Sequence, residues 1–263
     1  MTQNPFFKAL FAATFVFFLS ACATTSPNST DEEYDPWEKM NRATYKFNKA
    51  IDKAIYNPVT KTYRAVVPEV PRQGVSNVVR NLREPWILVN DILQLKFKRA
   101  ARTLSRFVIN SSIGMGGLFK VSEKMDIPYH SEDLGQTMAT WGVGDGPYFI
   151  IPFIGPSSTR DTTGFAAFIF ADPVTIGISK TNIKGLNLTR TGVDALDARS
   201  RAHDLINSVY DDPDGYELMR SSYRQKRIFD IHDGNPPEAD ADIFDDLEDE
   251  EEAEMEDKPE DRE

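Results

Sequence analysis

The sequence is poor in the residues that most catalytic and metal sites need. It has one cysteine, Cys22, and three histidines among 263 residues. A single thiol forms no internal disulfide, and no histidine has a second histidine or a cysteine at zinc-ligand spacing. A P-loop, an H-E-x-x-H motif and a G-x-S-x-G elbow are also missing. We therefore predict that the protein is not an enzyme, holds no metal and has no nucleic-acid partner.

The first 21 residues have the order of a secretory signal peptide. Lys8 precedes an apolar run from Ala9 to Leu19, and the small residues Ser20 and Ala21 follow it. The run is about half the roughly 20 residues that a bilayer-spanning helix needs, so cleavage is favoured over a permanent anchor. We expect residues 1–21 to be removed.

The cysteine at the end of this segment lies in a tetrapeptide, Leu19 to Cys22, that resembles the bacterial lipobox. The thiol of a lipobox cysteine is acylated, and each buried acyl CH₂ contributes about 0.8 kcal/mol to membrane binding. We predict lipidation of Cys22, with its acyl chains as the only attached group and no other cofactor. Ala23 stands where lipoproteins of the inner membrane usually carry aspartate, which by resemblance implies the outer membrane.

Both ends of the remaining chain lack a pattern that could build a core. Residues 22–36 are rich in Ser, Thr, Asn and acids, and we expect a flexible tether there. Residues 238–263 hold 16 acidic and 2 basic side chains, a net charge of −14 against −11 for the whole chain, so the rest carries about +3. Such a segment cannot bury enough apolar surface to fold. We predict a disordered acidic tail over 235–263.

Between these ends the apolar residues recur mostly at helical spacing. Asp35-Pro36 offers a helix start, and apolar residues then share one face until Asn57-Pro58 ends the pattern. Further helices are predicted over Val75–Leu82 before Pro85, over Ala100–Val108, from a Ser131 cap to Gly142, over Val193–Val209 and over Pro213–Phe229. No sustained alternation argues for a sheet. We predict one mainly α domain over 37–234.

Two segments are apolar nearly all round, Tyr148 to Ile154 and Phe165 to Ile178. Neither reaches transmembrane length, because prolines and glycines interrupt them, as at Asp172-Pro173. The sequence leaves open whether they are buried in the core or lie in lipid. The glycine-rich stretches 114–117 and 142–146 do not fit G-x-G-x-x-G, and turns or close packing are expected there.

A series of motifs resembles the VacJ/MlaA family of outer-membrane lipoproteins over about residues 35–234. They occur in the family's order after the lipobox: DPWEKMNR (35–42), YRAVVP (63–68), GVSN (74–77), NLREP (81–85), RFVIN (106–110), GMGGLF (114–119), EDLGQT (132–137), WGVG (141–144), GPY (146–148) and IGPS (154–157), followed by RD (160–161). The chain is identified by this series as a member of that family.

The resemblance implies a fold and a role that spacing alone does not supply. Family members form a helical ring that lies in the periplasmic leaflet of the outer membrane and associates with trimeric porins. They remove mislocalised phospholipids from the outer leaflet through a central amphipathic pore and hand them to a soluble periplasmic carrier, which maintains lipid asymmetry. Two alternatives remain: a lipoprotein that only scaffolds a porin or an envelope assembly, and a membrane-bound lipid hydrolase for which the sequence nominates no residue.

The resemblance also suggests site residues. Pore and hairpin candidates are Asn110, Gly114, Gly116, Gly117 and Phe119, where glycines permit a tight bend. Gating-helix candidates, which would set the position of that hairpin, are Asn41, Arg42, Phe47 and Asn48. Asn77 and Arg106 are further candidates, because polar and apolar residues interleave around them.

Overall fold

The computed structural model describes residues 35–181 and 183–236. The signal peptide, Cys22, most of the tether and residues 237–263 of the acidic tail lie outside the described residues. Helices and one pair of strands make up this part of the chain: α2 (Glu38–Ile51), η2 (Asp52–Tyr56), α3 (Asn57–Val66), α4 (Glu69–Leu93), α5 (Phe97–Ser112), η3 (Glu123–Met125), α6 (Leu134–Thr140), β1 (Tyr148–Ile151), β2 (Gly155–Ser158), α7 (Thr159–Ala171), α8 (Pro173–Ser179), α9 (Leu186–Arg201), α10 (His203–Asp211) and α11 (Gly215–Ile231).

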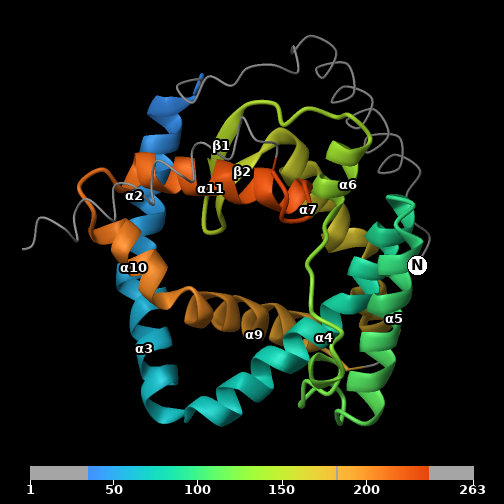
Figure 1. Ribbon diagram of the computed structural model, residues 1–263. Coiled ribbons are helices and arrows are strands. Elements are labelled where there is room, and N and C mark those ends of the chain that lie inside the picture. Colours follow the sequence, from blue (N-terminus) through green and yellow to red (C-terminus); the bar gives the residue numbers. More distant parts are fainter. Residues whose placement is uncertain (1–34, 182, 237–263) are drawn as a thin grey trace, which may run out of the picture.

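The helices are arranged in a ring (Figure 1). One side consists of α2, η2 and α3, and α4 leads from the end of α3 to the opposite side, where it packs along α5. The helix α9 crosses the ring and contacts α3, α4, α8 and α10, whereas α11 contacts α6, α10 and β2. The prediction of a mainly α, ring-shaped domain is therefore confirmed.

Two prolines that were expected to end helices do not end them. The helical backbone that begins in α2 continues past Asn57-Pro58 into α3. The π-helical turn η2 precedes the proline, and the Asn57 N–H donates to the Asp52 carbonyl, five residues back. This wider turn makes room for a proline ring and its missing N–H. Pro85 lies inside α4, where packing against α5, α6, α8 and α9 holds the helix together.

Other expectations from the sequence need correction as well. Tyr148–Ile151 and Gly155–Ser158 pair as an antiparallel hairpin, although neither strand alternates polar and apolar residues. Asp133, not Ser131, caps α6, because its carboxylate accepts the Gln136 N–H at 2.9 Å. The helix expected over 193–209 is divided into α9 and α10 at Ala202, where the backbone leaves the helical region.

The distribution of side chains is the reverse of that in a water-soluble domain. Among the described residues, 23 polar or charged side chains are buried against 10 apolar ones, while large apolar side chains are exposed on every long helix. The apolar core is small and lies under the hairpin, where Tyr45, Tyr148, Ile150, Tyr210 and Tyr216 pack together. Hydrophobic burial alone therefore does not hold the ring together.

Arginine–carboxylate pairs join the helices instead. Each pair connects two different elements and is at least partly buried, with two hydrogen bonds in the best cases. The joints are Arg199–Asp52 between α9 and η2, Arg190–Asp172 between α9 and the start of α8, Arg227 with Asp133 and Asp161 between α11 and the starts of α6 and α7, Arg106–Glu84 between α5 and α4, and Arg99–Asp233 between α5 and the end of α11.

The joint at Arg199 is a buried pair that involves three elements. Its Nε and Nη2 donate to the two carboxylate oxygens of Asp52 at 2.7 and 2.9 Å, and both side chains are buried. Nη2 also donates to Asn207 at 2.8 Å, which adds α10 to the joint. Removing either partner would leave a buried charge without its counterion.

We predict that Arg199→Gln lowers the free energy of unfolding by about 3 kcal/mol, because Asp52 is then buried without a cation. Arg64→Gln is the control, since Arg64 pairs at 3.5 Å with the largely exposed Asp204, and it should cost less than about 1 kcal/mol. Unfolding in detergent micelles, followed by circular dichroism, measures both. Equal losses for the two variants would contradict the assignment of Arg199 as a joint.

The end of α11 is fastened to the corner between α4 and α5. Asp233 accepts hydrogen bonds from Lys96 at 2.6 Å and from Arg99, and Arg99 also reaches Glu132 at 2.6 Å. Partial burial raises the pKa of Asp233, but its hydrogen bonds to Lys96 and Arg99 outweigh this effect, so the pKa lies below the ordinary 3.8. A carboxylate with a lowered pKa stabilises the fold above its unfolded pKa and loses this contribution as the pH falls.

We predict that Asp233→Asn lowers the unfolding free energy by about 1 kcal/mol at pH 7, a modest loss because the group is partly exposed. As the pH falls below the unfolded pKa of about 4 and through the lowered pKa of the folded state, the contribution of the wild-type carboxylate is lost, so the difference between the two proteins should shrink steadily. Unfolding curves of both proteins across this range test the claim. A difference that is independent of pH would refute it.

Candidate functional site

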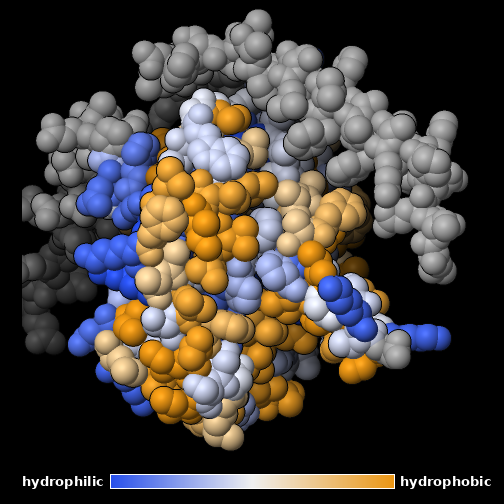
Figure 2. All heavy atoms as spheres, turned by 90° about the vertical axis from the view of Figure 1, so that its right-hand side faces the viewer, coloured by the Kyte–Doolittle hydropathy of each residue, from blue (hydrophilic) through white to orange (hydrophobic). Residues whose placement is uncertain are grey.

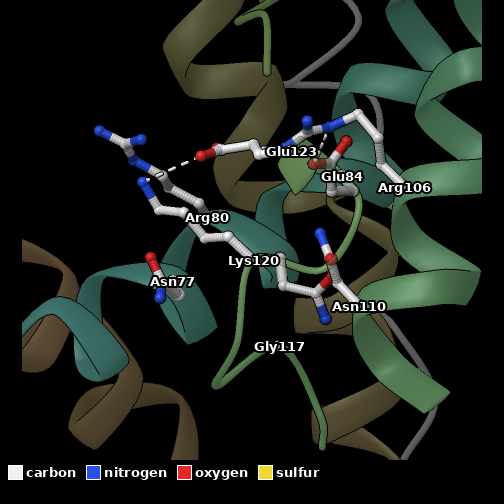
Figure 3. A pocket seen from close by; sticks show the side chains of 9 residues that line it. Asn77, Arg80, Glu84, Arg106, Asn110, Gly117, Lys120 and Glu123 are labelled. Atoms are coloured by element: carbon white, nitrogen blue, oxygen red, sulfur yellow. Dashed lines mark hydrogen bonds and ion pairs between the residues drawn. The ribbon is translucent and has the colours of Figure 1, made fainter. Parts of the chain in front are cut away.

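A polar face of α4 lies opposite α5 and the segment that follows it. Asn77, Arg80, Asn81 and Glu84 stand at positions i, i+3, i+4 and i+7, so they share one side of the helix. They line a narrow cleft, called here the α4–α5 cleft, together with residues of α5 and of the following segment (Figure 3): Arg106, Asn110, Gly117, Lys120 and Glu123. The cleft thus combines charged and amide groups from three parts of the chain.

The base of the cleft is a buried ion pair. Arg106 Nε donates to Glu84 Oε1 at 2.9 Å, and Nη1 donates to the Ile127 carbonyl at 2.5 Å. Burial raises the pKa of Glu84 and the nearby Arg106 opposes that rise. The second carboxylate oxygen of Glu84 is buried without a hydrogen-bond donor among the described residues. The pair therefore leaves one strong acceptor unused.

A wider hollow adjoins the cleft. It has a volume of about 600 Å³ and is lined by Arg80, Glu123, Asp126, Pro128 and Tyr129, so it shares two residues with the cleft. The guanidinium groups of Arg80 and Arg106 lie over the Tyr129 ring, at 5.2 and 5.1 Å from its centre. We call this space the outer hollow.

The segment after α5 turns back on itself and is held to both helices. Asn110 accepts the Ser122 N–H at 3.0 Å and donates to the Ser122 hydroxyl at 2.9 Å, while its carbonyl accepts the Gly117 N–H at 2.7 Å. Asn77 of α4 donates to the Leu118 carbonyl at 3.0 Å. Amide side chains thus fix a loop that has no regular structure of its own.

Glycines allow this loop to approach the helices closely. A Cβ at Gly117 would lie 2.5 Å from Asn81 Cβ, and one at Gly114 would lie 2.5 Å from the Asn110 carbonyl oxygen. Gly116 and Gly117 both have positive φ, at 71° and 93°, but nothing lies near Gly116. The role expected for this stretch, turns and close packing, matches this geometry.

The pore and hairpin candidates occupy different positions around this loop. Asn110 and Gly117 line the α4–α5 cleft, as do the further candidates Asn77 and Arg106. Gly114 packs behind the cleft against α5, whereas Gly116 and the half-exposed Phe119 do not line it. The structure therefore brings four of the predicted residues together in one place.

The gating-helix candidates contact the β hairpin. Asn41 donates to the Tyr148 carbonyl at 3.2 Å and accepts the Ile150 N–H at 2.9 Å, and Asn48, two turns later, bonds to Ile151 and Phe153 in the same way. The two amides therefore pair with the edge of β1 as a neighbouring strand would. In Figure 1, α2 and the segment after α5 lie on opposite sides of the ring.

The other two gating-helix candidates support the same contact. Arg42 bonds to Glu38 at 2.7 Å and to Glu217 of α11, and its guanidinium lies 4.4 Å from the centre of the Tyr216 ring. Phe47 packs edge-on against Phe153 with ring centres 5.0 Å apart. The four gating-helix candidates thus hold the β1–β2 hairpin and α11 in place.

The outer surface of the ring is apolar. Figure 2 shows the face formed around α5, where hydrophobic side chains cover a broad area. Exposed apolar residues here and on the neighbouring elements include Phe97, Leu104, Val108, Ile113, Met115, Phe165, Ile169, Phe170 and Ile176. A continuous exposed area of this kind marks an interaction surface with protein or membrane.

The second apolar segment of the sequence forms part of this surface. By length and composition Thr159–Ser179 is sufficient to cross a membrane, and little of it is buried. Its backbone breaks at Asp172, which caps α8 with a hydrogen bond to the Thr175 N–H at 2.9 Å. Helices of 13 and 7 residues reach about 20 and 10 Å, short of the roughly 30 Å of a bilayer core. Each piece alone is therefore shorter than a bilayer core.

Sequence reasoning missed half of the cleft. Five of its nine residues, Arg80, Asn81, Glu84, Lys120 and Glu123, were not named as candidates, nor was Tyr129 of the outer hollow. The spacing of Asn77, Arg80, Asn81 and Glu84 is a polar stripe that periodicity could have revealed on α4. Residues 120–129 reach the cleft and the outer hollow only through the path of the loop after α5, and no local sequence pattern indicates that path.

Comparison with known proteins gives consistent matches. The profile of the MlaA lipoprotein family matches residues 33–230. The "Intermembrane phospholipid transport system lipoprotein MlaA" of Escherichia coli (strain K12) is 30% identical over 240 residues, which cover 88% of this chain and 93% of that protein. The protein of the same name from Haemophilus influenzae is 28% identical over 237 residues, 87% of this chain and 92% of that protein.

Two further similarities cover different shares of the chain. A Rickettsia felis protein is 37% identical over 136 residues, 52% of this chain and 54% of that protein, so the match spans about half the length of that relative. A solved structure described as "Structural basis for maintenance of bacterial outer membrane lipid asymmetry" superposes with a TM-score of 0.66 at 29% identity. It covers 76% of this chain and 100% of the solved chain.

We predict that Gly117→Ala distorts the loop after α5, whereas Gly116→Ala does not. Both substitutions cost about 1–2 kcal/mol for the left-handed backbone, but only Gly117→Ala also forces a Cβ into Asn81, at about 1–3 kcal/mol more. Hydrogen exchange at residues 110–122 measures the loop, and thermal unfolding measures the fold. Equal effects for the two variants would contradict the packing described here.

Proposed function

Since the chain belongs to the MlaA lipoprotein family, we propose that it is an outer-membrane lipoprotein that removes mislocalised phospholipids from the outer leaflet. The lipids would pass through a central amphipathic pore to a soluble periplasmic carrier of the same pathway, which maintains the lipid asymmetry of the outer membrane. The names of the Escherichia coli and Haemophilus influenzae relatives and the subject of the similar solved structure support this role.

The reversed distribution of polar and apolar side chains carries the proposal. When acyl chains surround a protein, burying its apolar side chains does not stabilise the fold. Polar side chains are then better placed between the helices, where they do not contact lipid. The exposed apolar face around α5 (Figure 2) suits the periplasmic leaflet, where acyl chains on Cys22 would anchor the chain. The short helices α7 and α8 would lie in this leaflet without crossing it.

The α4–α5 cleft supplies the polar part of the path. Acyl chains can slide over apolar surface, but a phosphate headgroup needs charged and amide partners on the way. Asn77, Arg80 and Lys120 offer such groups next to the apolar surface of α5. A trimeric porin is the expected neighbour in the membrane, as the family resemblance implies.

A lipoprotein that only scaffolds a porin or an envelope assembly makes a different prediction for cross-linking. Photoreactive side chains at Leu104 on the outer face, Lys120 in the cleft and Lys226 on the exposed polar side of α11 separate the two roles. In intact cells a transporter should give phospholipid adducts at Leu104 and Lys120 but not at Lys226, because lipid would pass through the cleft.

Lipid at Leu104 alone would contradict transport through this cleft and favour a scaffold embedded in the leaflet. Porin adducts without lipid at any of the three positions would contradict both the leaflet placement and the channel. Mass analysis of the cross-linked protein identifies the attached species in each case.

A further inference from the structure

We propose that the α4–α5 cleft and the outer hollow together bind a phospholipid headgroup with a phosphate and a primary ammonium, as in phosphatidylethanolamine. This inference rests on the proposed function and names the headgroup that the site recognises. It follows from three observations: a cation without a counterion, several acceptors without donors, and an aromatic ring that is already covered.

Arg80 is the unpaired cation. Within the described residues no carboxylate lies within 4.0 Å of its guanidinium, which rests over Tyr129, and it lines both the cleft and the outer hollow. Figure 3 shows Arg80 and Lys120 extending in the same direction, away from the Arg106–Glu84 pair. A guanidinium in this position can bind a phosphate with two parallel hydrogen bonds.

Lys120 can provide a second contact to the phosphate. Its ammonium pairs with Glu123 at 3.3 Å, but both side chains are about one-third exposed, so this pair contributes little to stability. Turning Lys120 toward a phosphate would therefore cost little. Arg106, by contrast, is committed to Glu84 and to the Ile127 carbonyl.

The unused acceptors lie beside these cations. Glu84 Oε2, Asn77 Oδ1 and Asn81 Oδ1 are buried without donors among the described residues, and all three residues line the cleft. Buried acceptors normally find a partner, and an ammonium supplies three N–H donors. Glu123 and Asp126 add negative charge in the outer hollow, which favours a cationic group over a purely anionic headgroup.

A choline headgroup fits less well. Its quaternary nitrogen has no N–H to give to these acceptors, and proteins usually recognise it through aromatic faces. The aromatic ring of the outer hollow, Tyr129, already carries the guanidinium groups of Arg80 and Arg106. The space itself, about 600 Å³, is in the range of small-ligand sites.

The test measures lipid retained by the full-length mature protein in detergent micelles, by native mass spectrometry. The probes are phosphatidylethanolamine and phosphatidylcholine with identical acyl chains. Wild type should retain the ethanolamine lipid about fivefold better, and Arg80→Gln should reduce retention of both lipids about tenfold, the loss expected for one charge-assisted contact. Arg80→Lys should fall between wild type and Arg80→Gln, because it keeps the charge but loses the paired hydrogen bonds.

Arg102→Gln is the matched control, since Arg102 is an exposed arginine of α5 away from the cleft, and it should leave retention unchanged. Equal unfolding temperatures of the variants establish that each is folded. Unchanged retention in Arg80→Gln would overturn the site while leaving the transport proposal intact. Equal retention of the two lipids by wild type would overturn the ammonium recognition, and no retention of either would count against the proposed function itself.

Discussion

The ring depends on arginine–carboxylate pairs that join its helices. With a small apolar core under the hairpin, these pairs are the charged contacts that hold α9 to η2 and α8, and α11 to α6 and α7. An ion pair of this kind is directional, because guanidinium and carboxylate meet in one plane. It therefore fixes the angle between two helices, whereas a non-directional apolar contact would allow them to shift relative to each other. Rigid corners permit an open arrangement of helices that a collapsing apolar core would close.

The same design leaves the apolar residues free to face outward. Leu104, Val108 and Phe165 are exposed because nothing in the described chain covers them. The polar cleft between α4 and α5 lies next to this surface, so one side of the molecule offers both environments that a phospholipid contains. The amphipathic character of α5 explains why the two environments are adjacent. This helix turns its apolar side outward, and its Arg106 and Asn110 face α4.

Helix-forming periodicity made most of the fold predictable. The pattern located α2, α5 and α11 well, since amphipathic helices show their period locally, but Pro58 and Pro85 were misread because tertiary packing and a π-helical turn tolerate them. The β hairpin escaped notice because Asn41 and Asn48 stabilise it from a distant helix. In the candidate site, motif resemblance found Asn110 and Gly117, whereas Arg80 and Tyr129 meet only through the path of a loop. Contacts over long sequence separations leave no local signal.

We infer that the outer surface faces lipid while charged pairs hold the ring together. Spin labels on cysteines introduced at Leu104 and at Lys226 in membrane-reconstituted protein test it directly, by their collisions with dissolved oxygen and with a water-soluble nickel complex. Oxygen should be the more effective relaxing agent at Leu104, and nickel at Lys226, because oxygen concentrates in acyl chains. A Leu104 label that is as accessible to nickel as the Lys226 label would show that the apolar surface lies in water and would contradict this placement.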